Sequence, residues 1–294
     1  MTIRLDDQVA IVTGAGRGLG RTHALALAER GANIVVNDLG NADSVVREIE
    51  AAGGQAIASS ANVADFEQVD AMAKQALDAW GRVDILINNA GILRDKTFHK
   101  MSMDDFRQVV EVHLMGSANC TKAVWGSMRE QAYGRIIFTT SSTGLYGNFG
   151  QANYGAAKMA VVGLMNTLHL EGAKYDIRVN CLAPAAGTAM TDGLFPEGVF
   201  DMLTPESVSP GVVFLAGPDA PSRTILAAGG GAFAVYKGFE TDGISLLPDQ
   251  LSPEGVAAAW ESIADEHDMK TFASGFEQAG KFVGKNAEKL GIKL

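Results

Sequence analysis

The sequence predicts an α/β fold: a doubly wound parallel sheet with a helical C-terminal extension. Short apolar or β-branched runs alternate with longer helix-like stretches through most of the chain. These runs are apolar on both faces, as in strands that helices cover on both sides, and strands that alternate with helices form parallel sheets. After about residue 190 the pattern changes, and a polar tail with helical periodicity follows.

Six runs are predicted to be successive strands, with helices between them. The predicted strands are 9–13, 33–37, 56–60, 83–88, 135–140 and 177–181. The predicted helices lie near 19–30, 44–52, 66–80, 104–131 and 154–172. The stretch 191–210 holds three prolines without a clear period, which fits a loop and a short helix. GAFAVY at 231–236 is a candidate last strand.

The tail is expected to be a separate helical extension. We predict one domain at 1–237 and an extension at 238–294, packed on that domain or on a second subunit. Its clearest helix covers 252–267, where Ser252 can cap the N-terminus and Pro253 suits the first position. The last 20 or so residues also have a helical pattern.

Charge and cysteine content narrow the class of protein. The 24 Lys and Arg against 34 Asp and Glu give a net charge of −10, which argues against nucleic acid or an anionic membrane as a partner. The sequence shows no signal peptide and no apolar run as long as a membrane span. Cys120 and Cys181 are expected to be buried thiols. We therefore expect a cytoplasmic protein in a reducing compartment, without a metal site.

A glycine-rich turn follows the first predicted strand. In TGAGRGLG, Gly14, Gly18 and Gly20 precede a helix. Such glycines let backbone N–H groups approach a pyrophosphate, and the helix N-terminus adds partial positive charge. Because the turn lies between a predicted strand and a predicted helix, it indicates a dinucleotide site on a Rossmann-type sheet.

Asp38, just after the second strand, favours NAD over NADP. It lies 18 residues beyond Gly20, where a carboxylate can accept hydrogen bonds from a ribose 2′-OH and would repel a 2′-phosphate. Arg17 points the other way, because it could reach a 2′-phosphate. The direct repulsion by the carboxylate decides for NAD, and Arg17 is then a surface side chain near the diphosphate.

Small and amide residues follow two further strands. Asn88, Asn89, Ala90 and Gly91 end the fourth strand, and Asn62 follows the third. Ligands of open α/β sheets bind beyond the carboxyl ends of the strands. The small residues would leave room for a ribose, and Asn62 could bond the adenine amino group. Each asparagine could equally be a turn former that satisfies local backbone.

QANYGAAK at 151–158 places Tyr154 and Lys158 one helical turn apart, on one face. A nearby ammonium favours the phenolate and lowers the pKa of a tyrosine, which makes it a usable general acid/base. Ser141, 13 residues earlier and just past the fifth strand, could polarise a carbonyl. Taken alone, the Tyr-Lys pair is more often structural.

Together these motifs and Pro184 after the sixth strand resemble the short-chain dehydrogenase/reductase family, over roughly residues 5–235. The resemblance implies hydride transfer between a nicotinamide and a carbonyl/alcohol pair. It implies Tyr154 as proton donor and acceptor, Lys158 as ribose ligand and Ser141 as holder of the substrate oxygen. The expected cofactor-binding residues are Gly14, Arg17, Gly18, Leu19, Gly20, Asp38, Asn62, Val63, Asn89, Ala90, Gly91, Tyr154, Lys158, Pro184 and Gly187.

Two positions depart from the family pattern. Many members carry an asparagine in the helix before the fifth strand, where it holds a proton-relay water, and EVHLMGS places His113 there. A histidine can hydrogen-bond water and also titrate, so His113 is a candidate catalytic residue, and a buried structural histidine is the alternative. The usual Pro-Gly after the sixth strand is Pro184-Ala185.

A narrower resemblance concerns one subgroup, the (3R)-hydroxyacyl-CoA dehydrogenase units of type 2 peroxisomal multifunctional enzymes. NNAGILRDKTF (88–98), GLYGNFGQANY (144–154) and the tail LSPEGVAAAWESIADEHD are similar to it, and it also carries histidine where His113 stands. The resemblance implies NAD-dependent interconversion of (3R)-3-hydroxyacyl-CoA and 3-oxoacyl-CoA. It implies a homodimer or homotetramer, and a hydratase, if needed, on another polypeptide.

Three other functions stay open. A hydroxysteroid dehydrogenase would use a similar apolar pocket. A 3-oxoacyl-ACP reductase would prefer NADPH, against which Asp38 argues. A non-catalytic NAD(H) sensor would not need Ser141, Tyr154 and Lys158. Candidate contacts for the CoA phosphates are Arg94, Lys96 and Lys100, and candidates for the acyl path are Leu145, Tyr146, Phe149, Met190, Leu194 and Phe195; a solvated loop and ordinary core residues are the alternatives.

Overall fold

The computed structural model describes residues 2–187 and 199–293. Met190, Leu194 and Phe195 lie outside these residues. Contacts divide the chain into two compact units, Met1–Tyr236 and Lys237–Leu294. No helix among the described residues has both the length and the apolar character that a membrane crossing requires.

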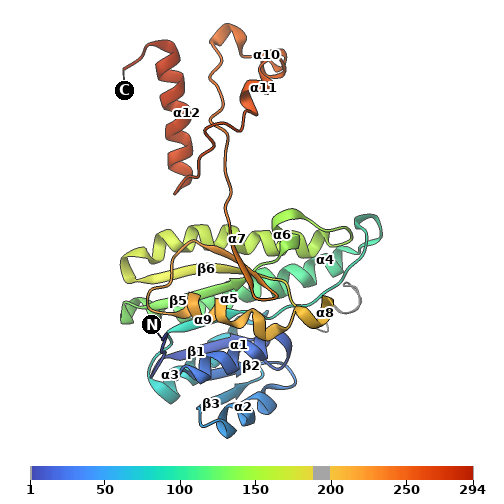
Figure 1. Cartoon of the computed structure of the whole chain (residues 1–294), viewed down its shortest axis with the longest axis vertical. Coiled ribbons are helices and arrows are strands. Elements are labelled where there is room, and N and C mark those ends of the chain that lie inside the picture. The colour runs from blue at the N-terminus through green and yellow to red at the C-terminus, as the bar shows by residue number, and fades with distance from the viewer. Residues whose placement is uncertain (1, 188–198, 294) are drawn as a thin grey trace. The chain divides into compact units, whose positions relative to one another are not determined.

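An eight-stranded sheet forms the centre of the first unit (Figure 1). Its order is β3-β2-β1-β4-β5-β6-β7-β8. The strands are β1 Val9–Thr13, β2 Asn33–Asn37, β3 Ala56–Ser59, β4 Ile85–Asn88, β5 Gly134–Thr139, β6 Ile177–Pro184, β7 Ile225–Gly229 and β8 Ala232–Tyr236. The winding direction reverses between β1 and β4, so the ligand crevice of such a sheet is expected beyond these two strands.

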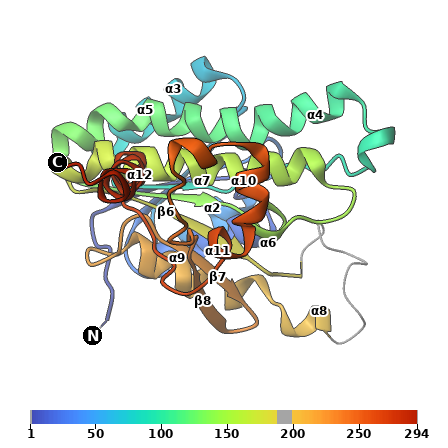
Figure 2. The same ribbon diagram turned by 90° about the horizontal axis from the view of Figure 1, so that it is seen from above.

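Helices cover both faces of the sheet (Figures 1 and 2). One face packs α1 (Gly18–Glu29), α2 (Ala42–Ala51) and α9 (Ser209–Ala216), and the other packs α3 (Phe66–Trp80), α5 (Gly116–Gln131) and α7 (Ala152–Gly172). Strand side chains are buried on both sides: Ile11 and Val35 contribute to one core cluster, Val12 and Val36 to the other. Cys120 and Cys181 are free and buried, as predicted.

The single helix predicted at 104–131 is divided. The chain forms α4 (Met103–Val110), a π-helical turn at Glu111–Met115, and then α5. π-turns inside helices occur frequently at functional sites. Here the turn holds His113, whose side chain is 2% exposed.

The remaining short elements include two that the sequence did not predict, α6 (Ser142–Tyr146) and α9, together with strand β7. GAFAVY does form the last strand, but β8 runs antiparallel to β7. The described residues also contain the one-turn helix α8 (Val199–Met202). Short 3₁₀ turns lie at Phe98–Lys100, Ala173–Tyr175, Pro205–Ser207 and Pro248–Gln250.

The second unit is helical. Ser252 caps the helix that follows, because its Oγ accepts a hydrogen bond from Gly255 N at 2.9 Å. The prediction of one continuous helix at 252–267 is wrong. Helix α10 (Pro253–Ala258) ends just before Ala259, and α11 (Trp260–Ile263) adds only one turn. The predicted last helix is present as α12 (Gly275–Leu290).

Candidate active site

The glycine-rich turn joins β1 to α1 at the carboxyl edge of the sheet. Gly14 and Gly18 have φ of +61° and +52°, which favours glycine. At Gly20 the need for glycine is packing, because a Cβ there would lie 2.2 Å from the Gly14 carbonyl oxygen. The turn can therefore bring its backbone N–H groups close to a ligand only with glycine at these positions.

Thr13 and Asn89 hold this turn against the end of β4. The Thr13 hydroxyl accepts hydrogen bonds from the N–H groups of Asn89 and Ala90, both at 3.0 Å. The Asn89 amide donates to the carbonyl oxygens of Thr13 (2.9 Å) and Gly14 (3.1 Å). The Asn89 side chain thus satisfies local backbone, which is the structural alternative for this asparagine.

Asp38 lies next to the glycine turn, at the end of β2. Its carboxylate accepts hydrogen bonds from the N–H groups of Gly16 (3.2 Å), Gly40 (3.0 Å) and Asn41 (3.1 Å). A Cβ on Gly16 would lie 2.5 Å from Asp38 Cγ, so glycine at 16 admits the carboxylate. These backbone donors fix the position of the Asp38 carboxylate beside the glycine turn.

The first cavity has a volume of about 550 Å³ and gathers most residues predicted to hold the adenosine half of a dinucleotide. It is lined by Gly14, Arg17, Asn37, Asp38, Leu39, Gly40, Asn41, Ala61, Asn62, Val63, Ala90, Gly91, Ile92 and Val112. The carboxylate, the small residues and the glycine turn fit a dinucleotide. Asn62 lines this cavity, but its Oδ1 also accepts a hydrogen bond from Ala64 N at 3.1 Å, so part of its amide is used locally.

A second cavity of about 570 Å³ holds all four predicted catalytic residues. It is lined by Leu19, Asn89, Gly91, Leu93, His113, Thr139, Ser141, Ser142, Thr143, Tyr146, Gly147, Asn148, Gln151, Tyr154, Lys158, Pro184, Ala185 and Ala186. Gly91 belongs to both cavities, so they adjoin. Of the predicted cofactor-binding residues, three line neither cavity: Gly18, Gly20 and Gly187. Gly187 is buried and its N–H donates to the Leu203 carbonyl at 2.6 Å.

Tyr154 and Lys158 lie one turn apart on α7, as predicted. Ser141 lies near Tyr154 and lowers the pKa of its hydroxyl. The Ser141 Oγ accepts a hydrogen bond from Thr143 N at 3.1 Å and so caps α6. Lys158 Nζ donates to the Thr139 carbonyl at 2.5 Å and lies 5.6 Å from the centre of the Tyr154 ring.

Burial governs the acid–base properties of this pair. Burial raises the pKa of Tyr154, and the charge of Asp95 raises it further. The Ser141 hydroxyl lowers it, but by less than burial raises it. Burial also lowers the pKa of Lys158 to about 7. The sequence predicted a tyrosine pKa lowered by Lys158, and this is wrong, because the pKa of Tyr154 is raised and burial is the largest cause. Removal from water disfavours the charged form of each residue.

His113 is packed against the loop that follows β4. Its Nε2 lies 2.8 Å from the Ile92 carbonyl oxygen and 3.1 Å from the Ile92 N–H. A Cβ on Gly91 would come within 2.3 Å of the ring. The ring also stands perpendicular to that of Tyr154, with the centroids 5.1 Å apart.

The electrostatics of His113 favour its neutral form. Burial, helped by the charge of Lys158, lowers its pKa to about 3. Nδ1 is buried and has no hydrogen-bond partner among the described residues. A neutral imidazole with one free nitrogen can hold a water, but it does not titrate near neutral pH.

Sequence reasoning missed several residues of the second cavity. Gln151 and Thr143 line it with Tyr154 and share a hydrogen bond of 2.9 Å. The one available signal was a polar side chain three residues before Tyr154. Of the acyl-path candidates, Tyr146 lines the cavity and Leu145 packs on the core, while Phe149 is 88% exposed.

Comparison with known proteins places this site in a family. The short chain dehydrogenase family model matches residues 8–197. A short-chain type dehydrogenase/reductase of Mycobacterium tuberculosis is 46% identical over 273 residues, which cover 89% of this chain and 95% of that protein.

Solved structures agree with this match. The structure of full-length peroxisomal multifunctional enzyme type 2 from Drosophila melanogaster has a TM-score of 0.85 and 38% identity, covering 98% of this chain and 51% of that one. A 7α-hydroxysteroid dehydrogenase complexed with NADH and 7-oxo glycochenodeoxycholic acid has a TM-score of 0.73 and 32% identity, covering 78% of this chain and 95% of that one. The chain therefore belongs to the short-chain dehydrogenase family of oxidoreductases.

Proposed function

We propose that this chain is an NAD-dependent dehydrogenase that interconverts (3R)-3-hydroxyacyl-CoA and 3-oxoacyl-CoA. One observation carries the proposal: Ser141, Tyr154 and Lys158 line one cavity, and that cavity adjoins, at Gly91, the cavity bounded by the Asp38 carboxylate. A dinucleotide that spans both cavities would present its reactive end to the tyrosine.

The residues of the first cavity support NAD as the cofactor. The Asp38 carboxylate can accept hydrogen bonds from a ribose 2′-OH and repels a 2′-phosphate. The glycine turn at the start of α1 offers backbone N–H groups to the pyrophosphate. The related 7α-hydroxysteroid dehydrogenase was solved with NADH. When bound, NAD supplies the hydride acceptor.

Tyr154 moves the proton. In the oxidation direction it takes the proton of the C3 hydroxyl, and in the reduction direction the neutral phenol donates to the C3 carbonyl oxygen. Ser141, which lines the same cavity, would hold the same oxygen. Lys158 would bind the nicotinamide ribose. His113 would hold a water through its free Nδ1.

The acyl-CoA substrate is supported by the extent of the likeness to the Drosophila enzyme, which covers 98% of this chain, including the second unit. We place the dehydrogenase in residues 1–237 and treat 238–294 as an extension of it. The assembly would be a homodimer or homotetramer in the cytoplasm, with any hydratase on a separate polypeptide. Of the candidate phosphate contacts, Lys96 bonds Asp105 at 3.3 Å, which leaves Arg94 and Lys100 as the stronger candidates.

A hydroxysteroid dehydrogenase is the second candidate. The relative solved with a 7-oxo bile acid is 32% identical over 78% of this chain, and a flat apolar cavity suits both a sterol and an acyl chain. The assay below separates the two.

The test is NADH formation with a medium-chain (3R)-3-hydroxyacyl-CoA, beside the (3S) isomer, NADP⁺ and a hydroxylated bile acid. We expect turnover with the (3R) thioester and NAD⁺ alone. Turnover with only the bile acid would move the substrate to sterols. No turnover with any of them, together with NADH binding, would favour the non-catalytic sensor.

A further inference from the structure

Two loops that flank Tyr154 are joined by hydrogen bonds. The loop after β4 meets the loop before α7 through the backbone, where Lys96 N donates to the Gly150 carbonyl at 2.9 Å. The Asn153 amide donates to the Arg94 carbonyl at 3.0 Å. The third link is between side chains: Gln151 Nε2 donates to Asp95 Oδ2 at 2.6 Å. This last link uses two groups that the proposed proton transfer does not need.

The Gln151 amide has a defined orientation. An ionised carboxylate only accepts hydrogen bonds, so Asp95 forces the nitrogen of the amide toward itself. At the other end, Oε1 accepts from the Thr143 hydroxyl at 2.9 Å and from the Asn148 amide at 3.1 Å. The amide nitrogen carries two hydrogens, and within the described part of the chain only the one on Asp95 has an acceptor. One N–H of a side chain that is 8% exposed is therefore available.

The Gln151 side chain lies at the reacting cavity. It lines the cavity that also contains Ser141 and Tyr154. Gln151 directly precedes α7, the helix that carries Tyr154. In a 3-oxoacyl or 3-hydroxyacyl thioester the C1 carbonyl is two bonds from C3, the carbon that Tyr154 and Ser141 would serve. A donor beside these two residues is thus placed for the C1 oxygen.

We propose that Gln151 donates a hydrogen bond to the C1 carbonyl of the thioester, and that Asp95 both orients this amide and repels substrates that carry a free carboxylate at C1. The inference rests on the proposed function and assigns its specificity. A thioester carbonyl is a neutral acceptor, whereas a carboxylate there would face the like charge of Asp95. The charge of Asp95 also reaches Tyr154, whose pKa it helps to raise.

Three small substrates separate the recognition of C1 from the chemistry at C3. They are the N-acetylcysteamine thioester of (3R)-3-hydroxybutanoate, the free acid, and 2-pentanol, which has no C1 carbonyl. The thioester carries no CoA, so remote contacts do not mask the effect. Wild type should prefer the thioester to the free acid by about tenfold in kcat/KM, since a carboxylate at C1 would face the like charge of Asp95.

Gln151→Leu should lower kcat/KM for the thioester by about tenfold and leave 2-pentanol within about twofold. The loss should appear mainly in KM, because the C1 carbonyl accepts the same hydrogen bond in the bound substrate and in the transition state of the reaction at C3. Asp95→Asn changes an exposed residue and lets the amide turn, so it should lower thioester activity less and narrow the preference over the free acid. Gln278→Leu, which removes the hydrogen bond between a glutamine and the Glu240 carboxylate in the second unit, is the matched control and should change neither substrate.

The outcomes are distinct. An equal loss with 2-pentanol in Gln151→Leu would make Gln151 a purely structural residue. No loss with the thioester, or an unchanged preference over the free acid in Asp95→Asn, would also overturn the inference. A wild type that oxidises 2-pentanol but not the thioester would instead overturn the proposed substrate, and with it the assignment of Gln151. If Gln151→Leu does not fold, the Asp95→Asn preference decides.

Discussion

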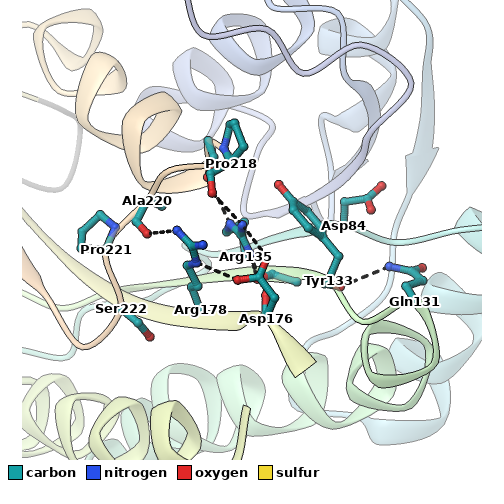
Figure 3. A network of polar contacts seen from close by, with 12 residues as sticks. Asp84, Gln131, Tyr133, Arg135, Asp176, Arg178, Pro218, Ala220, Pro221 and Ser222 are labelled. Atoms are coloured by element: carbon teal, nitrogen blue, oxygen red, sulfur yellow. Dashed lines mark hydrogen bonds and ion pairs between the residues drawn. The ribbon is translucent and has the colours of Figure 1, made fainter. Parts of the chain in front are cut away.

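The two edges of the sheet bury charged side chains in opposite ways. At the amino edge, the guanidinium of Arg135 is 1% exposed and all five of its N–H groups are used (Figure 3). They reach Asp176 and the carbonyl oxygens of Gly134, Asp176, Gly217 and Pro218. Asp84, buried at the same edge, accepts from Val9 N and from Arg82.

At the carboxyl edge the buried polar groups are left incomplete. Lys158 is 4% exposed, and its Nζ has one hydrogen-bond acceptor among the described residues, the Thr139 carbonyl. In the same described part, His113 Nδ1, Thr139 Oγ1 and Asn88 Oδ1 are buried without partners, whereas at the amino edge Gln8 Oε1 is the one such atom. A group whose hydrogen-bonding capacity is already used stabilises the fold, whereas one with spare capacity can bind a ligand. The comparison thus separates a structural edge from a functional edge.

The largest expected effect is on catalysis at the carboxyl edge. Tyr154→Phe removes the proton donor and should lower kcat by about 10²- to 10⁴-fold, the usual contribution of a general acid/base. The measurement is the initial rate of NADH formation at saturating substrate. Because the ring stays in place and only the hydroxyl is lost, the thermal midpoint should barely move.

The matched control is a tyrosine at the amino edge. Tyr133→Phe removes a hydroxyl that accepts a hydrogen bond from Gln8 at 3.2 Å, so it should cost about 1 kcal/mol of stability and no activity. If both phenylalanine variants lose activity equally, the division between the edges is wrong.

The next prediction compares the two buried cations, Arg135 and Lys158, which should matter for stability and for activity respectively. Arg135→Met should lower the free energy of unfolding by about 3–5 kcal/mol, because the carbonyl oxygens of Gly134, Asp176, Gly217 and Pro218 lose the donor that they share. Lys158→Met removes a poorly compensated charge and should leave this free energy about unchanged while abolishing turnover. Urea unfolding at pH 7 measures the free energy of unfolding of both variants, and the rate of NADH formation measures their turnover.

The pH dependence sharpens this comparison. The pKa of Lys158 is lowered to about 7 in the fold by burial, whereas an unfolded lysine holds its proton to about pH 10.4. Between these values the unfolded chain binds more protons, so the free energy of unfolding rises from pH 7 to pH 9. Lys158→Met should lack this rise, and a variant that keeps it would contradict the assignment.

The last effect concerns two buried histidines. Burial lowers the pKa of His23 and, with Lys158, that of His113 to about 3. An unfolded histidine binds a proton near pH 6.5, so the unfolded chain binds more protons between pH 3 and 6.5. Stability should therefore fall as the pH drops through this window, by about 1.4 kcal/mol per pH unit for each histidine.

Single variants divide this acid sensitivity. His113→Asn should remove about half of the slope, measured as urea midpoints between pH 7 and 4.5, and should keep kcat within about tenfold, because the amide can still hold a water. His267→Asn, at a side chain that is 83% exposed, should change nothing. An unchanged slope in His113→Asn would show that the histidine is charged in the fold.

The fold was predictable where local sequence carries the signal. Strands β1 and β2 match the predicted ranges, because their β-branched runs are unambiguous. Strand β6 begins where it was predicted to begin and extends further. Strand β7, ILAAG, was missed because alanines and glycines carry little strand propensity, and only its place between β6 and β8 makes it a strand. The π-turn inside the predicted helix at 104–131 has no local sign either.

The candidate site divides in the same way. The glycine turn, Asp38 and the Tyr154–Lys158 spacing were visible because each is a short-range pattern within one strand, turn or helix. The sequence could not show that Asn89 holds the turn through Thr13, since these residues are 76 positions apart. It could not show Gln151 on Asp95 either, across 56 positions.

The sequence by itself determined the order of elements, the nucleotide-binding turn and the presence of the Tyr-Lys pair, because these follow from local periodicity and spacing. Only the tertiary structure decided which charges are compensated. Arg135 and Lys158 are both buried cations, but the long-range neighbours of Arg135 use its whole hydrogen-bonding capacity, and those of Lys158 do not. The pKa of a buried group depends on that surrounding, which the chain assembles from distant segments.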